Sequence, residues 1–285
     1  MSIIRFIVFS NLFVSLCVVA LTWRTFAYLQ IKTSIPLLVL VFLATYFIYN
    51  FQRLFRLSKN LMVHQELGNR MKWVARHSKI ISISLGFAAL GMLVVLWWIE
   101  IRVVILLIVL GLLSVLYVVC FIPFRQQWWS FRAIPYLKIF IIGALWTGVT
   151  AFLPLLNEYD SHEFNNGKIL FILKLFLFVV AITLPFDIRD MHYDRHNETK
   201  TIPLKFGKNN TVVFGGVLLF VFIMISAYEW LVLTQISFAV FISEVVAIIV
   251  TTVLLVFSKK QQPELYYSFG IEATSLLLAA TILFN

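Results

Sequence analysis

The sequence predicts an all-α integral membrane protein with about nine transmembrane helices in a single bundle. The mean hydropathy is +0.95, and only 13% of the 285 residues are charged, too few to cover the water-facing surface of a soluble fold. Apolar runs of about 17 to 25 residues recur along the chain, and an α-helix needs this length to cross a bilayer. Because hydrocarbon excludes unpaired backbone groups, such runs indicate helices.

Each predicted helix is an apolar run that stops where charged residues begin. The first four runs are 4–23, 35–52, 80–99 and 101–123, and only Glu100 and Arg102 mark the division between the last two. The remaining five are 134–156, 168–186, 211–232, 236–257 and 265–284. No linker rich in Pro, Gly or Ser interrupts the sequence, so we expect residues 1–285 to form one domain.

The basic residues are distributed unevenly among the predicted loops, and this predicts the orientation. Of the 23 Lys and Arg residues, all but five fall at the N-terminus or in the loops after even-numbered helices; the exceptions are Arg24, Lys32, Arg102, Lys168 and Lys174. The N-terminus is therefore expected in the cytosol and the C-terminus on the opposite side. The net charge of +10 favours contact with anionic membrane lipids or an anionic substrate rather than nucleic acid.

Three aspartates follow the sixth predicted helix, in the segment DIRDMHYDRHNETKTIPLKFG. The spacings of Asp187, Asp190 and Asp194 place all three on one face of a helix. Carboxylate oxygens without cysteine suit Mg²⁺, which proteins often share with a substrate's phosphates. The alternative is that nearby Arg and Lys side chains form ion pairs with them at a solvated helix end. His192 and His196 point away from this face and lack a third ligand, so zinc is not expected.

The pattern Asp187-x-x-Asp190-x-x-x-Asp194, followed by Lys200-Thr201-Ile202-Pro203 and Gly207, resembles the second aspartate-rich motif of UbiA-type intramembrane prenyltransferases. Those proteins have nine transmembrane helices, with this motif after the sixth. The resemblance implies a central apolar cavity that opens toward the cytosol.

It also implies that the site binds an allylic isoprenoid diphosphate and transfers the isoprenoid chain to a lipophilic, possibly aromatic, acceptor. Asp187, Asp190 and Asp194 would be catalytic and would hold Mg²⁺, and Lys200 would bind the diphosphate. Metal and cationic groups stabilise the charge that develops on the leaving diphosphate. An apolar cavity keeps water away from the allylic cation.

The sequence departs from the family at the inner end of the second predicted helix. The family's first motif is Asn-Asp-x-x-Asp-x-x-x-Asp; here Asn50 is present, but the aspartate positions hold Phe51, Leu54 and Ser58. One interpretation is that Asn50, Arg53 and Arg56 bind the diphosphate directly, because guanidinium groups match phosphate geometry without a metal. The other is that the site has decayed and these cations anchor the helix to anionic lipid.

Four further charged residues lie in or beside predicted helices. Lys138 would bind the diphosphate or extend to the membrane interface as an ordinary boundary lysine. Lys174, Glu244 and Glu272 fall within apolar segments, where charge is costly and pairing is expected. A Glu–Lys pair is the default interpretation, and deprotonation of an acceptor by Glu272 is the alternative.

Two other functions fit the same pattern. A terpene cyclase of the UbiA type would ionise the diphosphate without any acceptor. A non-catalytic protein that binds isoprenoid lipids in a decayed site would explain the missing first motif. Transport is not favoured, because no pair of helices is broken by Gly or Pro at mid-membrane.

Overall fold

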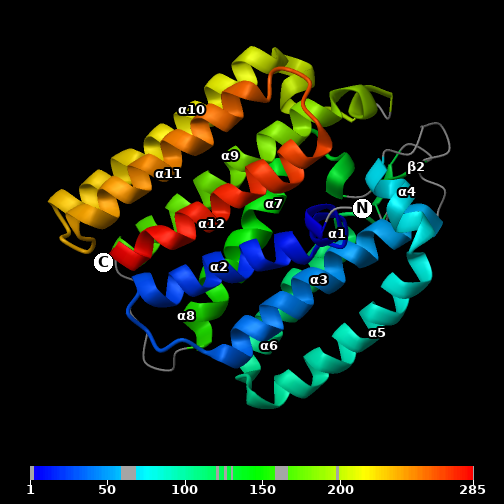
Figure 1. Cartoon of the computed structure of the whole chain (residues 1–285), viewed down its shortest axis with the longest axis horizontal. Coiled ribbons are helices and arrows are strands. Elements are labelled where there is room, and N and C mark those ends of the chain that lie inside the picture. Colours follow the sequence, from blue (N-terminus) through cyan, green and yellow to red (C-terminus); the bar gives the residue numbers. More distant parts are fainter. Residues whose placement is uncertain are drawn as a thin grey trace.

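A computed structural model describes residues 3–58, 69–119, 122–124, 127–129, 131–157, 166–196 and 199–284. The helices run alongside one another in one bundle (Figure 1). The first half contains α1 (Ile3–Phe9), α2 (Leu12–Tyr28), α3 (Ile35–Ser58), α4 (Asn69–Arg76), α5 (Ser78–Val95) and α6 (Ile101–Leu116). The second half contains α7 (Lys138–Thr147), α8 (Leu153–Asn157), α9 (Asn166–His196), α10 (Ile202–Leu231), α11 (Phe238–Phe257) and α12 (Glu272–Ala280).

Short irregular helices extend several of these elements. A π-helical turn, Gly148–Phe152, joins α7 to α8, and a second one, Tyr266–Ile271, leads into α12. Single 3₁₀ turns cover Leu96–Trp98, Phe131–Ala133 and Thr281–Phe284. Every apolar run that the sequence predicts as a span therefore has a helical counterpart.

The predicted multi-pass membrane fold is confirmed, but the number nine is not. Among the described residues, seven helical segments are long and apolar enough to cross a membrane, or eight if α1 and α2 count as one bent span. The helix α6 has only 16 residues, which is about 24 Å at the usual rise per residue and short of the roughly 30 Å hydrocarbon core.

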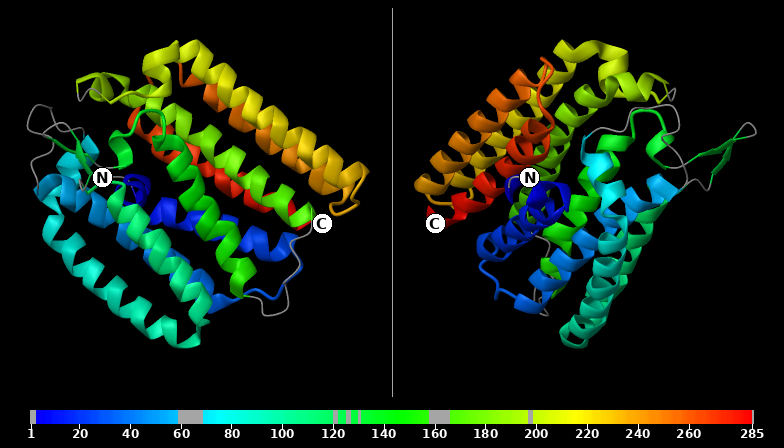
Figure 2. Two further views of the ribbon diagram at one scale, coloured as in Figure 1. Left: turned by 180° about the vertical axis from the view of Figure 1, so that it is seen from behind. Right: turned by 45° about the vertical axis from the view of Figure 1, so that its right-hand side comes forward.

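The predicted helix 101–123 is too long at its C-terminal end. Its last residues belong to a hairpin of β1 (Ile122–Phe124) and β2 (Gln127–Trp129), in which Ile122 pairs with Trp129. The hairpin projects beyond the helices (Figure 2). Pro123 lies in β1, and a proline lacks the N–H that an α-helix needs at an interior position.

The predicted helix 4–23 is broken and also extends further than expected. Asn11 adopts the left-handed conformation with φ of 66°, which Asn tolerates better than most residues, and α1 and α2 meet at an angle of 71°. The helix α2 then continues to Tyr28, so Arg24 lies inside it rather than in an outer loop. Its charge is balanced by an ion pair with Glu244 of α11.

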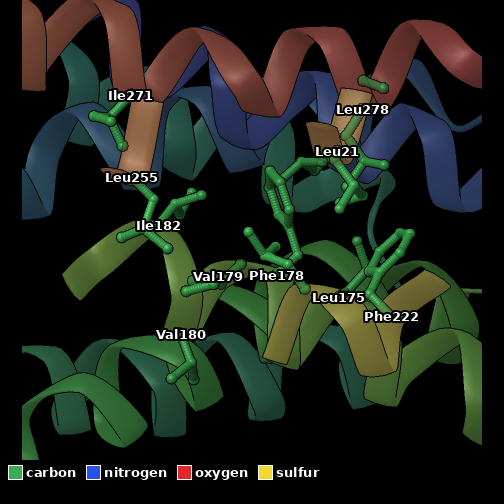
Figure 3. Packing of buried hydrophobic residues seen from close by; sticks show 14 of the residues in the cluster. Leu21, Leu175, Phe178, Val179, Val180, Ile182, Phe222, Leu255, Ile271 and Leu278 are labelled. Carbon is green, nitrogen blue, oxygen red and sulfur yellow. The ribbon is translucent and has the colours of Figure 1, made fainter. Parts of the chain in front are cut away.

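The helix α9 occupies the centre of the bundle. It packs against α7, α10 and α11, and residues such as Phe178 and Val179 are completely buried. Figure 3 shows side chains of α2, α9, α10, α11 and α12 meeting in this apolar cluster. The aspartates are therefore carried by a largely enclosed helix, which continues without a break through all three of them.

The expected pairing of buried charges is confirmed for Lys174 and Glu244. The Lys174 Nζ lies 3.1 Å from Glu244 Oε2 and also forms an ion pair with Glu229 of α10. Together with Arg24, these side chains form a fully buried cluster of two cations and two anions. Glu272 does not join this cluster, because it lines a cavity at the other end of the bundle.

Candidate active site

A cavity of about 270 Å³ lies between α3, α7, α9 and α12. Its walls in the interior of the bundle are apolar and aromatic: Ile48, Tyr49, Ile142, Leu145, Trp146, Val179, Ile182 and Phe186. Charged residues line it at the end of α3, the beginning of α7 and the end of α9, which all lie at one end of the bundle. The cavity therefore combines a charged end with an apolar interior.

Cations outnumber acids in the lining of this cavity. The six cationic residues are Arg53, Arg56, Arg70, Arg132, Lys138 and Arg189, and the three acidic residues are Asp187, Asp190 and Glu272. Within the described part of the chain, Arg56 and Arg132 form no ion pair with an acidic side chain. The cavity is thus suited to an anion.

The three aspartates are held by cationic side chains. The Lys138 Nζ lies 2.5 Å from Asp187 Oδ1 and 3.4 Å from Asp194 Oδ2. Asp190 receives two hydrogen bonds from Arg189, of 2.8 Å from Nε and 3.2 Å from Nη2. Ion pairing, the alternative interpretation of the motif, is therefore present in the structure. Lys138 lies on a different predicted helix, so the spacing of the motif did not indicate it as the partner of these carboxylates.

Two basic residues at the end of α3 reach the cavity. Arg53 and Arg56 both line the cavity, and Arg53 also donates a hydrogen bond of 3.0 Å to the backbone oxygen of Phe9. Phe51, in place of the first aspartate, stacks between Phe47 and Phe55 along the helix. The end of α3 thus presents guanidinium groups next to the positions at which the family motif has carboxylates.

Two predicted diphosphate ligands lie outside the cavity lining. The buried Asn50 amide donates to the backbone oxygens of Ser10 and Tyr46, at 3.0 and 2.9 Å, and accepts a hydrogen bond from Asn11. It fastens α3 to the break between α1 and α2. The Lys200 side chain is exposed, and the Lys200 backbone oxygen accepts a hydrogen bond of 2.9 Å from Tyr136.

Arg70 and Arg132 are cavity residues that the sequence analysis did not single out. Arg70 donates to Val8 O and Asn11 Oδ1, both at 3.0 Å, and to Ser268 Oγ at 2.8 Å. Burial lowers the pKa of Arg70, while Glu272 and Glu264 oppose this shift. Burial would also lower the pKa of Arg132, but Tyr117, Asp190 and Asp194 raise it above its usual value. In the sequence, Arg70 and Arg132 are distinguished only by their position in two predicted loops that contain several basic residues.

The residues at this site do not fit Mg²⁺ bound on the aspartates. Among the described residues, no three His, Cys, Asp or Glu side chains are arranged to hold a metal ion. The Lys138 ammonium occupies the space between Asp187 and Asp194. A divalent ion about 4 Å from an ammonium group would be repelled by roughly 8 kcal/mol at an effective dielectric constant near 20. Exposed His192 packs edge-on against His196.

The fold and the cavity define a multi-pass, all-helical membrane protein with a charged site enclosed in its bundle. No protein-family model matches the sequence, and no curated protein matches it. Several solved structures match almost the whole chain, although their sequence identity to it is only 11 to 15%.

A UbiA homologue from Archaeoglobus fulgidus bound to GPP and Mg²⁺ superposes with a TM-score of 0.66, at 12% identity over 98% of both chains. A structure reported as digeranylgeranylglyceryl phosphate synthase gives a TM-score of 0.58 at 15% identity, again over 98% of both. The UbiA homologue from Aeropyrum pernix K1 gives 0.57 at 11% identity, over 100% of this chain and 96% of that one.

The chain therefore has the UbiA fold, as the aspartate motif implied. Magnesium accompanies the isoprenoid diphosphate in the Archaeoglobus fulgidus structures bound to GPP or DMAPP, so the expected cofactor is found with this fold. In the present chain, Lys138 and Arg189 form ion pairs with the aspartates.

Proposed function

We propose that this protein binds an isoprenoid diphosphate in the cavity and transfers the isoprenoid chain to a lipophilic acceptor. The observation that carries the proposal is the division of the cavity into a cation-rich end and an aromatic, apolar interior. Such a cavity matches a molecule with a charged head and a hydrocarbon tail. The shared fold with UbiA homologues that bind GPP or DMAPP supports the same substrate class.

The reaction breaks the bond between C1 of the isoprenoid and the diphosphate oxygen. The electron pair leaves with the oxygen, so negative charge grows on the diphosphate while C1 becomes an allylic cation. A nucleophilic atom of the acceptor then forms the new bond to C1, and the acceptor loses its proton. The products are the alkylated acceptor and inorganic diphosphate.

Arg53, Arg56 and Arg132 stabilise the leaving diphosphate in this proposal. Guanidinium groups present paired N–H donors that match phosphate oxygens, and such contacts strengthen as the negative charge grows. Asp190 acts through Arg189, since its two hydrogen bonds fix the direction of that guanidinium. Asp187 and Asp194 act through Lys138 in the same way. We expect the charged end to face the cytosol, where isoprenoid diphosphates are dissolved.

The aromatic walls protect the allylic cation. The Trp146 Nε1 donates a hydrogen bond of 3.0 Å to the Tyr49 hydroxyl, which fixes both rings beside the cavity. Their π faces stabilise a nearby carbocation as they do other cations. The apolar neighbours exclude water, which would otherwise convert the cation to an alcohol.

The test is release of inorganic diphosphate by the purified protein in lipid nanodiscs. Geranyl, farnesyl and geranylgeranyl diphosphate are supplied in turn, with a native lipid extract as the source of acceptor, and lipid products are identified by mass spectrometry. We expect diphosphate release together with an alkylated lipid. Arg56→Ala should reduce the release rate by about tenfold or more, whereas Arg195→Ala, an exposed residue of α9, should not change it.

A second candidate function is favoured by one observation. The positions of the first aspartate motif hold Phe51, Leu54 and Ser58, as expected for a protein that holds isoprenoid lipids without cleaving them. Binding of the diphosphates without release of inorganic diphosphate would replace transfer by this function. Release with a hydrocarbon or alcohol as the product, in the absence of acceptor, would instead identify a cyclase.

A further inference from the structure

We infer that this protein binds the diphosphate without a metal ion, with the Lys138 ammonium taking the place of Mg²⁺ at the aspartates. The inference rests on the proposed function, since it assumes that an isoprenoid diphosphate enters the cavity. It concerns how the chain recognises that group and departs from the relatives solved with Mg²⁺.

Lys138 lies where a metal ion held by the aspartates would have to lie. Its ammonium contacts carboxylate oxygens about two helical turns apart on α9, at 2.5 Å from Asp187 and 3.4 Å from Asp194. The exposed fractions of these three side chains are only 8%, 3% and 1%. A buried carboxylate needs a cationic partner, and here that partner is part of the chain.

The packing of α7 against α9 fixes the position of this ammonium. Gly143 lies on α7 where it faces α9, and a Cβ atom at this position would come within 2.7 Å of Val180 Cγ2. The two helices therefore approach closely beside the site. The Lys138 side chain is thus held between the carboxylates by a rigid contact and does not extend toward the membrane interface.

The opposite wall of the cavity presents guanidinium groups, and the aspartate positions of the first motif hold no carboxylate there. Arg53 is anchored on Phe9 O, and Arg70 is anchored on Val8 O, Asn11 Oδ1 and Ser268 Oγ. These hydrogen bonds build the two arginines into the wall of the bundle. Guanidinium groups bind phosphate oxygens directly, whereas carboxylates bind them only through a metal ion.

Both walls of the cavity therefore favour direct binding of the diphosphate by cationic side chains over binding through a metal ion. One wall lacks the aspartates of the first motif, and on the other wall the remaining carboxylates already form ion pairs with Lys138 and Arg189. The cations that line the cavity supply the positive charge that a diphosphate requires. Added Mg²⁺ would have to displace Lys138 before it could reach Asp187 and Asp194 together.

The first experiment measures the affinity for geranyl diphosphate by titration calorimetry in nanodiscs, once with millimolar Mg²⁺ and once with EDTA. We expect the two dissociation constants to agree within about twofold. A loss of more than about tenfold in EDTA, which is 1.4 kcal/mol, would overturn the inference and leave the proposed function intact. No binding in either buffer would overturn the proposed function and the inference with it.

The second experiment removes the lysine and looks for a metal site in its place. Binding of Mn²⁺, followed by electron paramagnetic resonance, should be undetectable in the original protein and should appear in Lys138→Ala, in which Asp187 and Asp194 lose their cation. Lys138→Arg keeps a cation and should bind no Mn²⁺. In Lys138→Ala combined with Asp187→Asn, the new metal binding should be lost again.

The melting temperature in detergent identifies any variant that fails to fold. Equal Mn²⁺ binding by the original protein and by Lys138→Ala would contradict the inference, because a metal ion would then share the aspartates with Lys138. The comparison does not depend on turnover, so it remains informative for a protein that binds diphosphate without cleaving it.

Discussion

The Lys138 Nζ and the Asp187 Oδ1 lie 2.5 Å apart, and this contact joins α7 to α9 at the charged end of the cavity. The same ammonium reaches Asp194, so one side chain of α7 connects two turns of α9. A positive charge was expected among the aspartates, and it belongs to the chain itself. A change in the position of α7 relative to α9 should therefore change the binding of the diphosphate at this site.

Gly143→Ala should disturb this arrangement from within the bundle. The new methyl group would lie 2.7 Å from Val180 Cγ2 and 3.1 Å from Phe176 Cε2, so α7 and α9 must separate slightly. Overpacking of this kind costs about 1 to 3 kcal/mol. We expect a lower melting temperature and weaker binding of geranyl diphosphate.

The matched control is Gly111→Ala, because no atom lies within 4 Å of a methyl group at this position of α6. Alanine favours a helix over glycine by about 1 kcal/mol, so this variant should be as stable as the original protein or slightly more so. If both variants melt alike, Gly143 does not set the distance between the two helices.

Arg70→Ala should weaken both stability and diphosphate binding. The substitution removes three hydrogen bonds that tie α4 to the break between α1 and α2 and to Ser268. It also removes one cation from the cavity lining. We expect a loss of about 1.5 to 3 kcal/mol in unfolding free energy, the range for hydrogen bonds to charged groups, and a higher dissociation constant.

Arg70→Lys separates these two effects, because it keeps the charge and loses the forked hydrogen bonds. Arg76→Ala serves as a control on the same helix, since Arg76 is exposed. It should leave the melting temperature and the affinity unchanged. An Arg70→Ala protein with the original affinity would remove Arg70 from the diphosphate site.

Hydropathy was sufficient to predict a helical, multi-pass membrane protein, because the length of an apolar helix is a local property of the sequence. The break at Asn11 was not predictable in this way, since the apolar run continues through it and the turn is stabilised in part by contacts with Asn50 and Arg70, which are distant in the sequence. Likewise, Lys138 and Asp187 are far apart in the sequence. Their contact depends on how α7 packs against α9, and the hydropathy pattern along the sequence does not indicate this packing.

Some of the cationic residues that line the cavity could be predicted from the sequence, and others could not. Arg53 and Arg56 lie within the segment that corresponds to the family's first motif, next to its aspartate positions, so their place at the cavity could be anticipated. Arg70 is one of several basic residues in a polar loop, and only the folding of α4 against α1 brings it to the site. Asn50 matches the motif, but Asn11 and Ser10 occupy its hydrogen bonds.

Gly207→Ala should destabilise the beginning of α10. Gly207 has φ of 79° and ψ of 163° inside the helical segment, a conformation that is essentially restricted to glycine. It allows the chain to kink between Pro203 and the long span that follows. We expect a loss of about 1 to 3 kcal/mol, measured as a lower melting temperature in detergent.

Gly216→Ala is the matched control on the same helix, because a methyl group there would meet no atom within 4 Å. That variant should be neutral or slightly stabilising. Equal melting temperatures for the two variants would mean that the kink at Gly207 can straighten without cost.

The buried charge cluster provides a test by paired substitution. Arg24, Lys174, Glu229 and Glu244 are all completely inaccessible to solvent, and Arg24 and Lys174 both form ion pairs with Glu244. Arg24→Met leaves Lys174 facing two carboxylates, and Glu244→Leu leaves Arg24 without its partner. Each single change should lower the unfolding free energy by about 3 to 5 kcal/mol, since it strands a buried charge.

The double variant Arg24→Met with Glu244→Leu should be more stable than the sum of the two losses predicts. It retains the ion pair of Lys174 with Glu229 and leaves the cluster electrically neutral, so no buried charge lacks a partner. Unfolding of the four proteins in detergent by increasing concentrations of sodium dodecyl sulfate gives the coupling energy of the cycle. Losses that simply add would show that Arg24 and Glu244 do not stabilise one another, and the cluster would then depend on Lys174 alone.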